Sequence, residues 1–135
     1  MVVDTNVFVY ALLRVEGLYQ EAGDTIEAAD RIIVPDSIWA EMVSSVWQWV
    51  RAGHHSLAEG VDALERGAAF VTDEIQTKEL WERALQLAVS ANHPPYDAIF
   101  AALAEREGTR VVTYDQRFRL AFPDLTVSPT EFLAR

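Results

Sequence analysis

Four carboxylate residues stand far apart in the sequence: Asp4, Glu41, Asp97 and Asp115. Mg²⁺ prefers oxygen ligands of this kind and keeps several water molecules that a substrate phosphate can replace. A divalent cation held by carboxylates lowers the pKa of a bound water molecule, and its charge offsets the negative charge that develops during phosphoryl transfer. If the fold brings the four side chains together, they predict hydrolysis of a phosphodiester bond with Mg²⁺ or Mn²⁺.

Short strands and helices alternate along the chain. Buried or β-prone segments predict strands at Met1–Val3, Arg31–Val34, Phe70–Thr72, Arg110–Thr113 and Leu125–Val127. Apolar periodicity predicts helices at Val7–Leu13, Leu18–Asp30, Asp36–Arg51, His55–Arg66, Thr77–Ala91 and Pro94–Glu107. The alternation predicts an α/β fold, a three-layer α/β/α sandwich around a parallel sheet of four or five strands. In such sheets, ligands bind beyond the carboxyl ends of the strands.

Two of the carboxylates occupy the place that this rule indicates. Asp4 follows the first predicted strand directly, and Asp115 stands two residues after Thr113 ends a later strand. An aspartate at such a position is also a common N-cap of the following helix, where it stabilises the helix by about 1 kcal/mol. Helix capping alone is therefore an alternative function for both residues.

Asp97 is predicted in the first turn of its helix. A carboxylate there gains from the helix dipole whatever its function, so a structural position is one interpretation. Ala101 and Ala104 continue the same side of the helix as a stripe of small residues, which allows another backbone to approach closely. This stripe favours an orientation of Asp97 into a crevice.

Glu41 falls in the second turn of the helix predicted from Asp36. It is aligned with Ser44, Ser45 and Gln48, as on an ordinary solvated face. Apolar residues occupy both flanks of this stripe, so we expect the helix to be buried widely and its polar stripe to line a site.

Length and composition limit the class of protein. The 135 residues are half apolar and include no cysteine, which fits a single domain over residues 1–135 without disulfide bonds or thiolate metal sites. We find no cationic leader and no apolar run near the roughly 20 residues that cross a bilayer, which predicts a soluble cytoplasmic protein with no membrane contact. The formal charge of −10 argues against general binding of polyanions. Divalent cations, arginines or a basic partner would have to supply positive charge.

Three segments resemble the PIN-domain family. The opening VVDTNVFVY, over Val2–Tyr10, is similar to the first motif of that family. The segments Pro95–Glu105, which begins PYDA, and Val111–Phe118, which reads VVTYDQRF, are similar to its closing motif. Because their order and spacing cover nearly the whole chain, the sequence is identified as a PIN domain.

The resemblance implies a five-stranded parallel sheet and a metal-dependent ribonuclease. It places the acidic positions of the family, which bind Mg²⁺ or Mn²⁺ and catalyse, on Asp4, Glu41, Asp97 and Asp115. Asn6 and Thr113 match polar positions of the family and are expected to orient metal-bound water or substrate. The compact members that this chain resembles are VapC-like toxins, which implies an RNA substrate, a cognate antitoxin and a homodimer.

The chain departs from the family in two respects. Ser44 stands where the family often has asparagine, and the chain is more acidic than many toxins of this kind. Neither departure removes a predicted metal ligand, and both would fit a protein that recognises one structured RNA. Arg14, Arg117 and Arg119 are the candidates for phosphate contacts, with ordinary surface charge as the alternative.

Other conspicuous side chains receive structural interpretations. We expect His54, His55 and His93 to have ordinary surface roles, and the first two diverge on any regular element. His93 precedes two prolines near Asp97, and contact with substrate is the alternative for it. Trp47 and Trp49 cannot share a helical face. Either one of them lies in a dimer or antitoxin contact, or the helix is broadly buried.

Two other functions remain possible for the same sequence pattern. A catalytically inert PIN scaffold would bind RNA or protein without cleavage, although the intact acidic set argues against it. An aspartate-based phosphotransfer domain would also place Asp4 after the first strand, but it needs a lysine near the phosphoryl group. The only lysine, Lys78, lies after a different strand.

Overall fold

The five strands form one parallel sheet. The computed structural model describes residues 1–135, and the strand order is β3-β2-β1-β4-β5. The strands are β1 Val2–Val3, β2 Ile33–Pro35, β3 Asp73–Ile75, β4 Val111–Val112 and β5 Thr126–Val127. Val2 pairs with Ile33 on one side and with Val111 on the other, so β1 lies at the centre. The chain reverses its direction of travel across the sheet between β3 and β4, a feature that places ligand sites at the carboxyl edge of β1 and β4.

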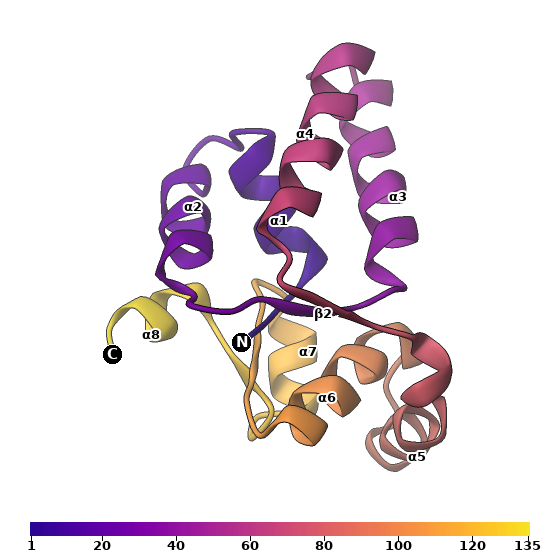
Figure 1. The fold of residues 1–135 in the computed structure, drawn as a ribbon. Helices are drawn as coiled ribbons and strands as arrows, with labels where there is room; N and C mark the ends of the chain where they lie inside the picture. Colours follow the sequence, from indigo (N-terminus) through magenta and orange to yellow (C-terminus); the bar gives the residue numbers. More distant parts are fainter.

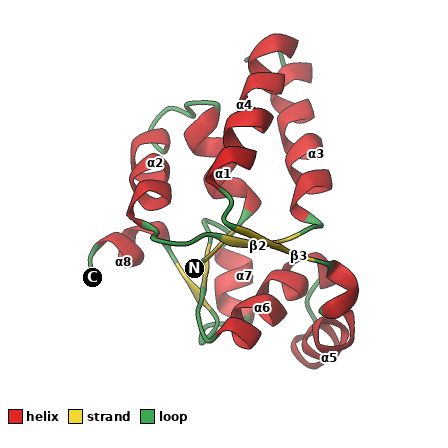
Figure 2. Ribbon diagram, in the orientation of Figure 1, coloured by secondary structure: helices red, strands yellow, loops and turns green.

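Helices cover both faces of the sheet. They are α1 Thr5–Leu12, α2 Tyr19–Ala28, α3 Ile38–Arg51, α4 Leu57–Phe70, α5 Trp81–Ala91, α6 Pro95–Glu107, α7 Gln116–Ala121 and α8 Pro129–Leu133, with a 3₁₀ helix, η1, at Thr77–Glu79. Helices α1 to α4 lie on one side of the sheet and α5 to α7 on the other, while α8 contacts α2 (Figures 1 and 2). The predicted three-layer α/β/α sandwich with a parallel sheet is confirmed.

Helix α6 is held directly against the sheet. It contacts β1, β2 and β4, and Ala98, Ala101 and Ala104 on it are completely buried. These small side chains let the helix approach the apolar strands closely, as their spacing predicts. Pro95 stands in the first turn, and Gly108 ends the helix with a φ of 65°, in the left-handed region that glycine tolerates.

Helices α3 and α4 pack as an antiparallel hairpin that extends away from the sheet (Figure 1). A Cβ atom at Gly60 would lie 2.9 Å from Val46, and one at Gly67 would lie 2.8 Å from Met42 and 3.0 Å from Leu12. The two glycines therefore allow α4 to approach α3 and α1 more closely than alanine would.

Several predicted boundaries differ from the structure. The strand predicted at Phe70–Thr72 is wrong, because α4 continues to Phe70 and the strand is Asp73–Ile75. The helix predicted over Thr77–Ala91 is divided at Leu80 into η1 and α5, and Pro35 belongs to β2. The capping alternative for Asp115 implies a helix after it, which is α7, but the bounds of α7 and the presence of α8 were not predicted, because six and five residues carry little apolar periodicity.

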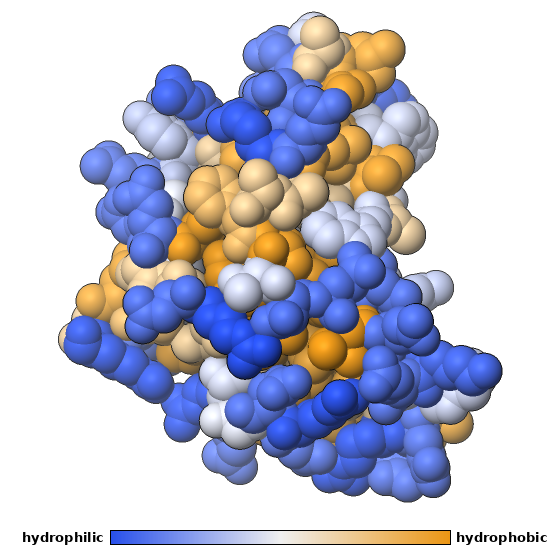
Figure 3. All heavy atoms as spheres, viewed as in Figure 1, coloured by the Kyte–Doolittle hydropathy of each residue, from blue (hydrophilic) through white to orange (hydrophobic).

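Large apolar side chains remain on the surface of α3, α4 and α5. The exposed residues on α3 and α4 are Val43, Trp47, Leu57, Val61 and Phe70. Figure 3 shows hydrophobic surface among hydrophilic side chains over this part of the molecule. The expectation that α3 is buried on both flanks is therefore wrong, and Trp47, which is 54% exposed, lies outside the core. No helix is both long enough and apolar enough to span a bilayer.

Candidate active site

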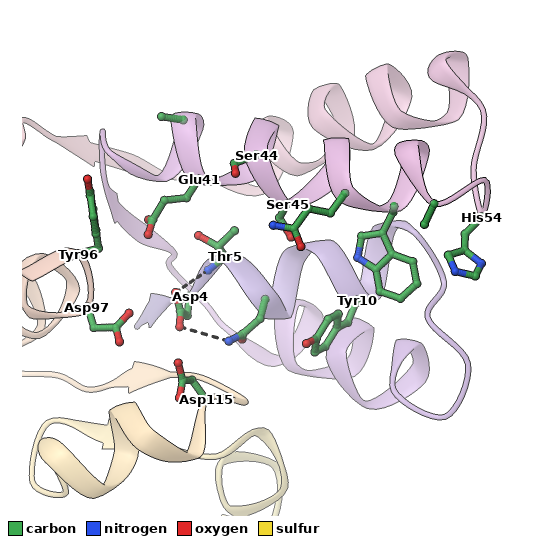
Figure 4. A pocket seen from close by; sticks show the side chains of 15 residues that line it. Asp4, Thr5, Tyr10, Glu41, Ser44, Ser45, His54, Tyr96, Asp97 and Asp115 are labelled. Carbon is green, nitrogen blue, oxygen red and sulfur yellow. Dashed lines mark hydrogen bonds between the residues drawn. The ribbon is translucent and has the colours of Figure 1, made fainter. Parts of the chain in front are cut away.

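One pocket, with a volume of about 840 Å³, lies at the carboxyl edge of the central strands and beside α3. All four candidate carboxylates line it, and each comes from a different part of the chain. Figure 4 shows the side chains of Asp4, Glu41, Asp97 and Asp115 turned toward the same space. The fold thus brings together the four residues that the sequence separates.

Asp4 is the most deeply buried of the four, with 6% of its surface exposed. It follows β1 and caps α1, since its Oδ1 accepts a hydrogen bond of 2.8 Å from the Thr5 N–H. Its Oδ2 accepts one of 2.7 Å from the Thr113 hydroxyl and a longer one of 3.4 Å from Asn6 Nδ2. Asp4 therefore caps α1, as the alternative interpretation of the sequence has it, and also lines the pocket.

Thr113 and Asn6 connect the two sides of the site. The Thr113 hydroxyl, completely buried, accepts hydrogen bonds from Asn6 Nδ2 at 3.2 Å and from the Asp115 N–H at 3.0 Å. Asn6 Oδ1 accepts one of 3.1 Å from the Tyr114 N–H. This network fixes the loop after β4 against the turn after β1, so it sets the position of Asp115 relative to Asp4.

Asp115 and Asp97 reach the pocket from the N-terminal ends of two different helices, α7 and α6. Asp115 caps α7, with its Oδ1 accepting a hydrogen bond of 3.1 Å from the Phe118 N–H. Asp97 stands in the first turn of α6 and is half-buried. Its Oδ2 lies 2.7 Å from His93 Nε2, at the turn before the helix.

His93 lies beside the site, in contact with Asp97. Its side chain is only 11% exposed, so the expectation of an ordinary surface role is wrong. The imidazole packs against the rings of Phe118 and Phe122, at centroid distances of 6.1 and 5.6 Å. His93 thus joins the carboxylate of Asp97 to the aromatic cluster of α7, the helix that Asp115 caps.

Replacement of His93 by leucine is expected to lower the free energy of unfolding at pH 7 by about 1–3 kcal/mol, because the partly buried Asp97 loses its hydrogen-bond partner. His93→Gln, whose amide can still donate, should lose less. Urea denaturation of both variants measures the difference. Equal losses in the two variants would show that ring packing, and not the hydrogen bond, accounts for the effect of His93.

Glu41 stands on α3 and is turned into the pocket rather than into solvent (Figure 4). Its Oε2 is buried and makes no hydrogen bond of normal geometry, and the same is true of Thr5 Oγ1, although the Thr5 hydroxyl lies near enough to Glu41 to oppose the rise in the pKa of that carboxyl. Buried polar atoms are normally paired, so these two oxygens mark a place where a ligand could bind. Ser44, Ser45 and Gln48 line the pocket beside Glu41, as the polar stripe predicts.

Three of the four carboxylates have a raised pKa, chiefly because they are buried. Burial raises the pKa of Asp4 to about 7, and the charges of Asp97 and Asp115 add to this against the opposing hydrogen bond from Thr113. Burial, together with the charges of Asp4 and Asp97, raises the pKa of Glu41 to about 7. The pKa of Asp97 is raised by burial and by Asp115, although its contact with His93 opposes this.

These shifts describe a pocket in which negative charge is costly and a cation would be favoured. The donor atoms are carboxylate oxygens, which suit Mg²⁺, Mn²⁺ and Ca²⁺. No three of the carboxylate or imidazole groups are arranged as ligands of a single ion. The arrangement is therefore an acidic site with the chemistry for divalent cations, but without a preformed ligand cage.

The candidate phosphate-binding arginines do not line the pocket. Arg14, which has a φ of 52°, lies over the ring of Tyr19. Arg119 donates a hydrogen bond of 2.9 Å to the carbonyl oxygen of Thr113, so it supports the loop that carries Asp115. Contact of these arginines and Arg117 with phosphate stays a prediction.

Comparison with known structures gives several matches to the whole fold. A protein from Pyrobaculum aerophilum, PAE2754, has a TM-score of 0.73 and 21% identity, with 99% of this chain and 89% of that chain covered. A toxin–antitoxin complex from Klebsiella pneumoniae has a TM-score of 0.68 and 20% identity, with 95% and 96% covered. VapBC2 from Rickettsia felis, bound to a DNA fragment from its promoter, has a TM-score of 0.66 and 15% identity, with 94% and 96% covered. At these identities the likeness concerns the fold.

Comparison of the sequence itself identifies the family. No curated protein matches the chain significantly. The family model described as PIN domain matches residues 1–121, a range that contains all four carboxylates and both supporting polar residues. The chain therefore belongs to the PIN-domain family.

Proposed function

We propose that this chain is a metal-dependent endoribonuclease that hydrolyses RNA phosphodiester bonds, and that it is the toxin of a toxin–antitoxin pair. The observation that carries the proposal is the convergence of Asp4, Glu41, Asp97 and Asp115 on one pocket of a PIN domain. The pKa values of Asp4, Glu41 and Asp97 are raised, first by burial and then by neighbouring carboxylates, which supports a pocket that gains from a bound cation.

The residues present fit Mg²⁺ or Mn²⁺. All candidate ligands are oxygen atoms, and Glu41 Oε2 is a buried acceptor without a hydrogen bond of normal geometry. Asp4, Glu41, Asp97 and Asp115 would hold the ion or ions. When bound there, a divalent ion would supply the positive charge that phosphodiester hydrolysis requires and would favour ionisation of the attacking water.

The chain's own residues would keep this acidic site in a fixed geometry. The Thr5 N–H and the Thr113 hydroxyl each hold one oxygen of Asp4, so its carboxylate cannot rotate freely. Asn6 and Thr113 together fix the loop before Asp115. Such fixed charges reduce the reorganisation needed when a phosphate group enters and reacts.

The proposed role as a toxin has support from two kinds of observation. Two of the similar structures are described as a toxin–antitoxin complex and as VapBC2. The exposed apolar side chains of α3 and α4 are of the type that protein partners cover, either an antitoxin or a second copy of the chain. The net charge of −10 favours a basic partner.

An aspartate-based phosphotransfer function has no comparable support. Lys78, the only lysine, lies in η1 against the ring of Trp81. It does not line the pocket that contains Asp4. A phosphoryl group on Asp4 would therefore lack the cationic side chain that stabilises it in such domains.

The test is cleavage of a mixed RNA pool by the purified wild type and Asp97→Asn, with Mg²⁺ or Mn²⁺ and then with EDTA. We expect cleavage only with the metal, and a loss of about 10²–10³-fold in the variant, as for other groups that stabilise developing charge. If both proteins are inert on every RNA and calorimetry detects no binding of Mn²⁺, the proposal fails. The chain would then be an inert PIN scaffold.

A further inference from the structure

The pocket has two chemically different ends. One end holds the four carboxylates. The other, here called the neutral arm, extends along α3 from Ser44, where it meets the acidic end, and is lined further on by Tyr10, Ser45, Gln48, Trp49, Ala52 and His54 (Figure 4). Figure 4 shows Tyr10, Ser45 and His54 displaced from the carboxylates toward the far end of α3. The neutral arm contains no acidic residue, lysine or arginine, so it suits an uncharged part of a ligand whose charged part lies at the carboxylates.

The aromatic side chains of the neutral arm are held by their neighbours. The Trp49 ring lies 5.4 Å from His54 and 6.3 Å from His55, with interplanar angles of 59° and 68°. Neither imidazole is therefore stacked in parallel on the indole. Tyr10 packs at 5.4 Å against Tyr114, whose hydroxyl donates a hydrogen bond of 3.0 Å to Glu21. Fixed, half-buried rings lose little entropy when a flat ligand stacks on them.

The polar side chains of the arm lie on one face of α3. Ser44, Ser45 and Gln48 bring two hydroxyl groups and an amide group to the pocket, and each can both donate and accept hydrogen bonds. Aromatic rings beside neutral hydrogen-bonding groups are what unpaired nucleobases meet in proteins that bind single-stranded RNA. A base inside a duplex could not reach this arm, because its edges are paired and its faces are stacked.

We propose that the neutral arm binds an unpaired base of single-stranded RNA by stacking on Trp49, while the adjoining phosphate lies at the carboxylates. This inference rests on the proposed ribonuclease function, because it names the part of the RNA that the pocket holds. The total pocket volume of about 840 Å³ lies within the range of sites that enclose a small organic group.

The test measures binding rather than cleavage. Fluorescence anisotropy of a labelled single-stranded RNA is recorded with Mn²⁺, on the Asp97→Asn background so that the RNA stays intact. Trp49→Ala is expected to weaken binding by about 10- to 100-fold, as loss of one stacked base does in other proteins, while Trp49→Phe keeps most of the affinity. Trp47→Ala is the matched control, because Trp47 lies on the same helix but is exposed and packs against Arg51 at 4.7 Å.

A set of RNAs with one abasic position each identifies the base. We expect one abasic position to weaken binding to the protein that retains Trp49 and to have no further effect on Trp49→Ala, as for two partners of one contact. If Trp49→Ala binds like Trp47→Ala, or if duplex RNA binds as tightly as single-stranded RNA, the inference is overturned. Cleavage is measured separately on proteins that retain Asp97. Unchanged binding by Trp49→Ala together with normal cleavage by the protein that retains Asp97 would overturn the base-binding inference alone, whereas Trp49-dependent binding with no cleavage by the protein that retains Asp97 would overturn only the ribonuclease proposal.

Discussion

Replacement of Asp4 by asparagine is expected to reduce metal-dependent RNA cleavage by about 10²–10³-fold or more, the usual cost of losing a charge-stabilising group at a reacting centre. Asp4 lies between the other carboxylates, and its charge interacts with Glu41, Asp97 and Asp115. Asparagine retains an oxygen that can accept the hydrogen bond from the Thr5 N–H, so the cap of α1 is preserved. The amide nitrogen that replaces Oδ2 cannot accept the hydrogen bonds from Thr113 and Asn6, so a circular-dichroism spectrum of the variant checks its fold before the cleavage rates are compared.

The measurement is the initial rate of cleavage of one RNA identified from the mixed pool, with calorimetry of Mn²⁺ binding beside it. Asp24→Asn serves as the control, because Asp24 is an exposed aspartate on α2 away from the pocket. It removes the same charge from the whole chain, so any general electrostatic effect on RNA association appears in both variants. A rate for Asp4→Asn within tenfold of the control would exclude Asp4 from the reacting centre.

The sequence predicted the sheet better than it predicted the element boundaries. Apolar strand residues such as Val2, Val3, Val111 and Val112 are all completely buried. Such short β-prone runs can be recognised in the sequence without knowing which residues they contact in the fold. The strand β3 is different, because it is an edge strand of mixed exposure that begins at Asp73. Of the apolar residues before it, Phe70 is the last residue of α4 and Val71 follows the helix.

The sequence predicts a site residue best where the order of the strands alone decides the place of its side chain. Asp4 and Asp115 follow adjacent parallel strands, so their side chains must emerge at the same edge of the sheet. Glu41 depends on the rotation of α3 about its axis, which only the packing against α1 and α4 sets. The contact of His93 with Asp97 depends on the turn before α6, and the aromatic cluster that holds the imidazole forms only when α7 is in place. Such contacts have no periodic signal in the sequence.

The glutamate on α3 provides the largest expected gain in stability. Because Glu41 has its pKa raised from 4.5 to about 7 in the folded protein, its ionisation disfavours the folded state. The penalty is absent below about pH 4.5, where the group is protonated in both states, and it grows as the pH rises to about 7 and stays constant above. Each pKa unit corresponds to about 1.4 kcal/mol, so the full shift corresponds to about 3.5 kcal/mol. Because Glu41 is only partly buried, solvent screens part of this penalty, and Glu41→Gln should raise the free energy of unfolding by about 2 kcal/mol at pH 8.

Urea denaturation of the wild type and Glu41→Gln in EDTA, from pH 4 to pH 8, measures this difference. The gain should vanish near pH 4, because a protonated Glu41 and a glutamine carry the same charge. Glu65→Gln is the matched control, because Glu65 is an exposed glutamate on α4 outside the pocket, and we expect no comparable gain there. Saturating Mn²⁺ should reverse the order at pH 8, because the wild type then gains binding energy that the variant lacks. A gain of equal size at pH 4 and pH 8 would attribute the effect to packing, and no gain at either pH would mean that ionised Glu41 carries no penalty in the folded protein.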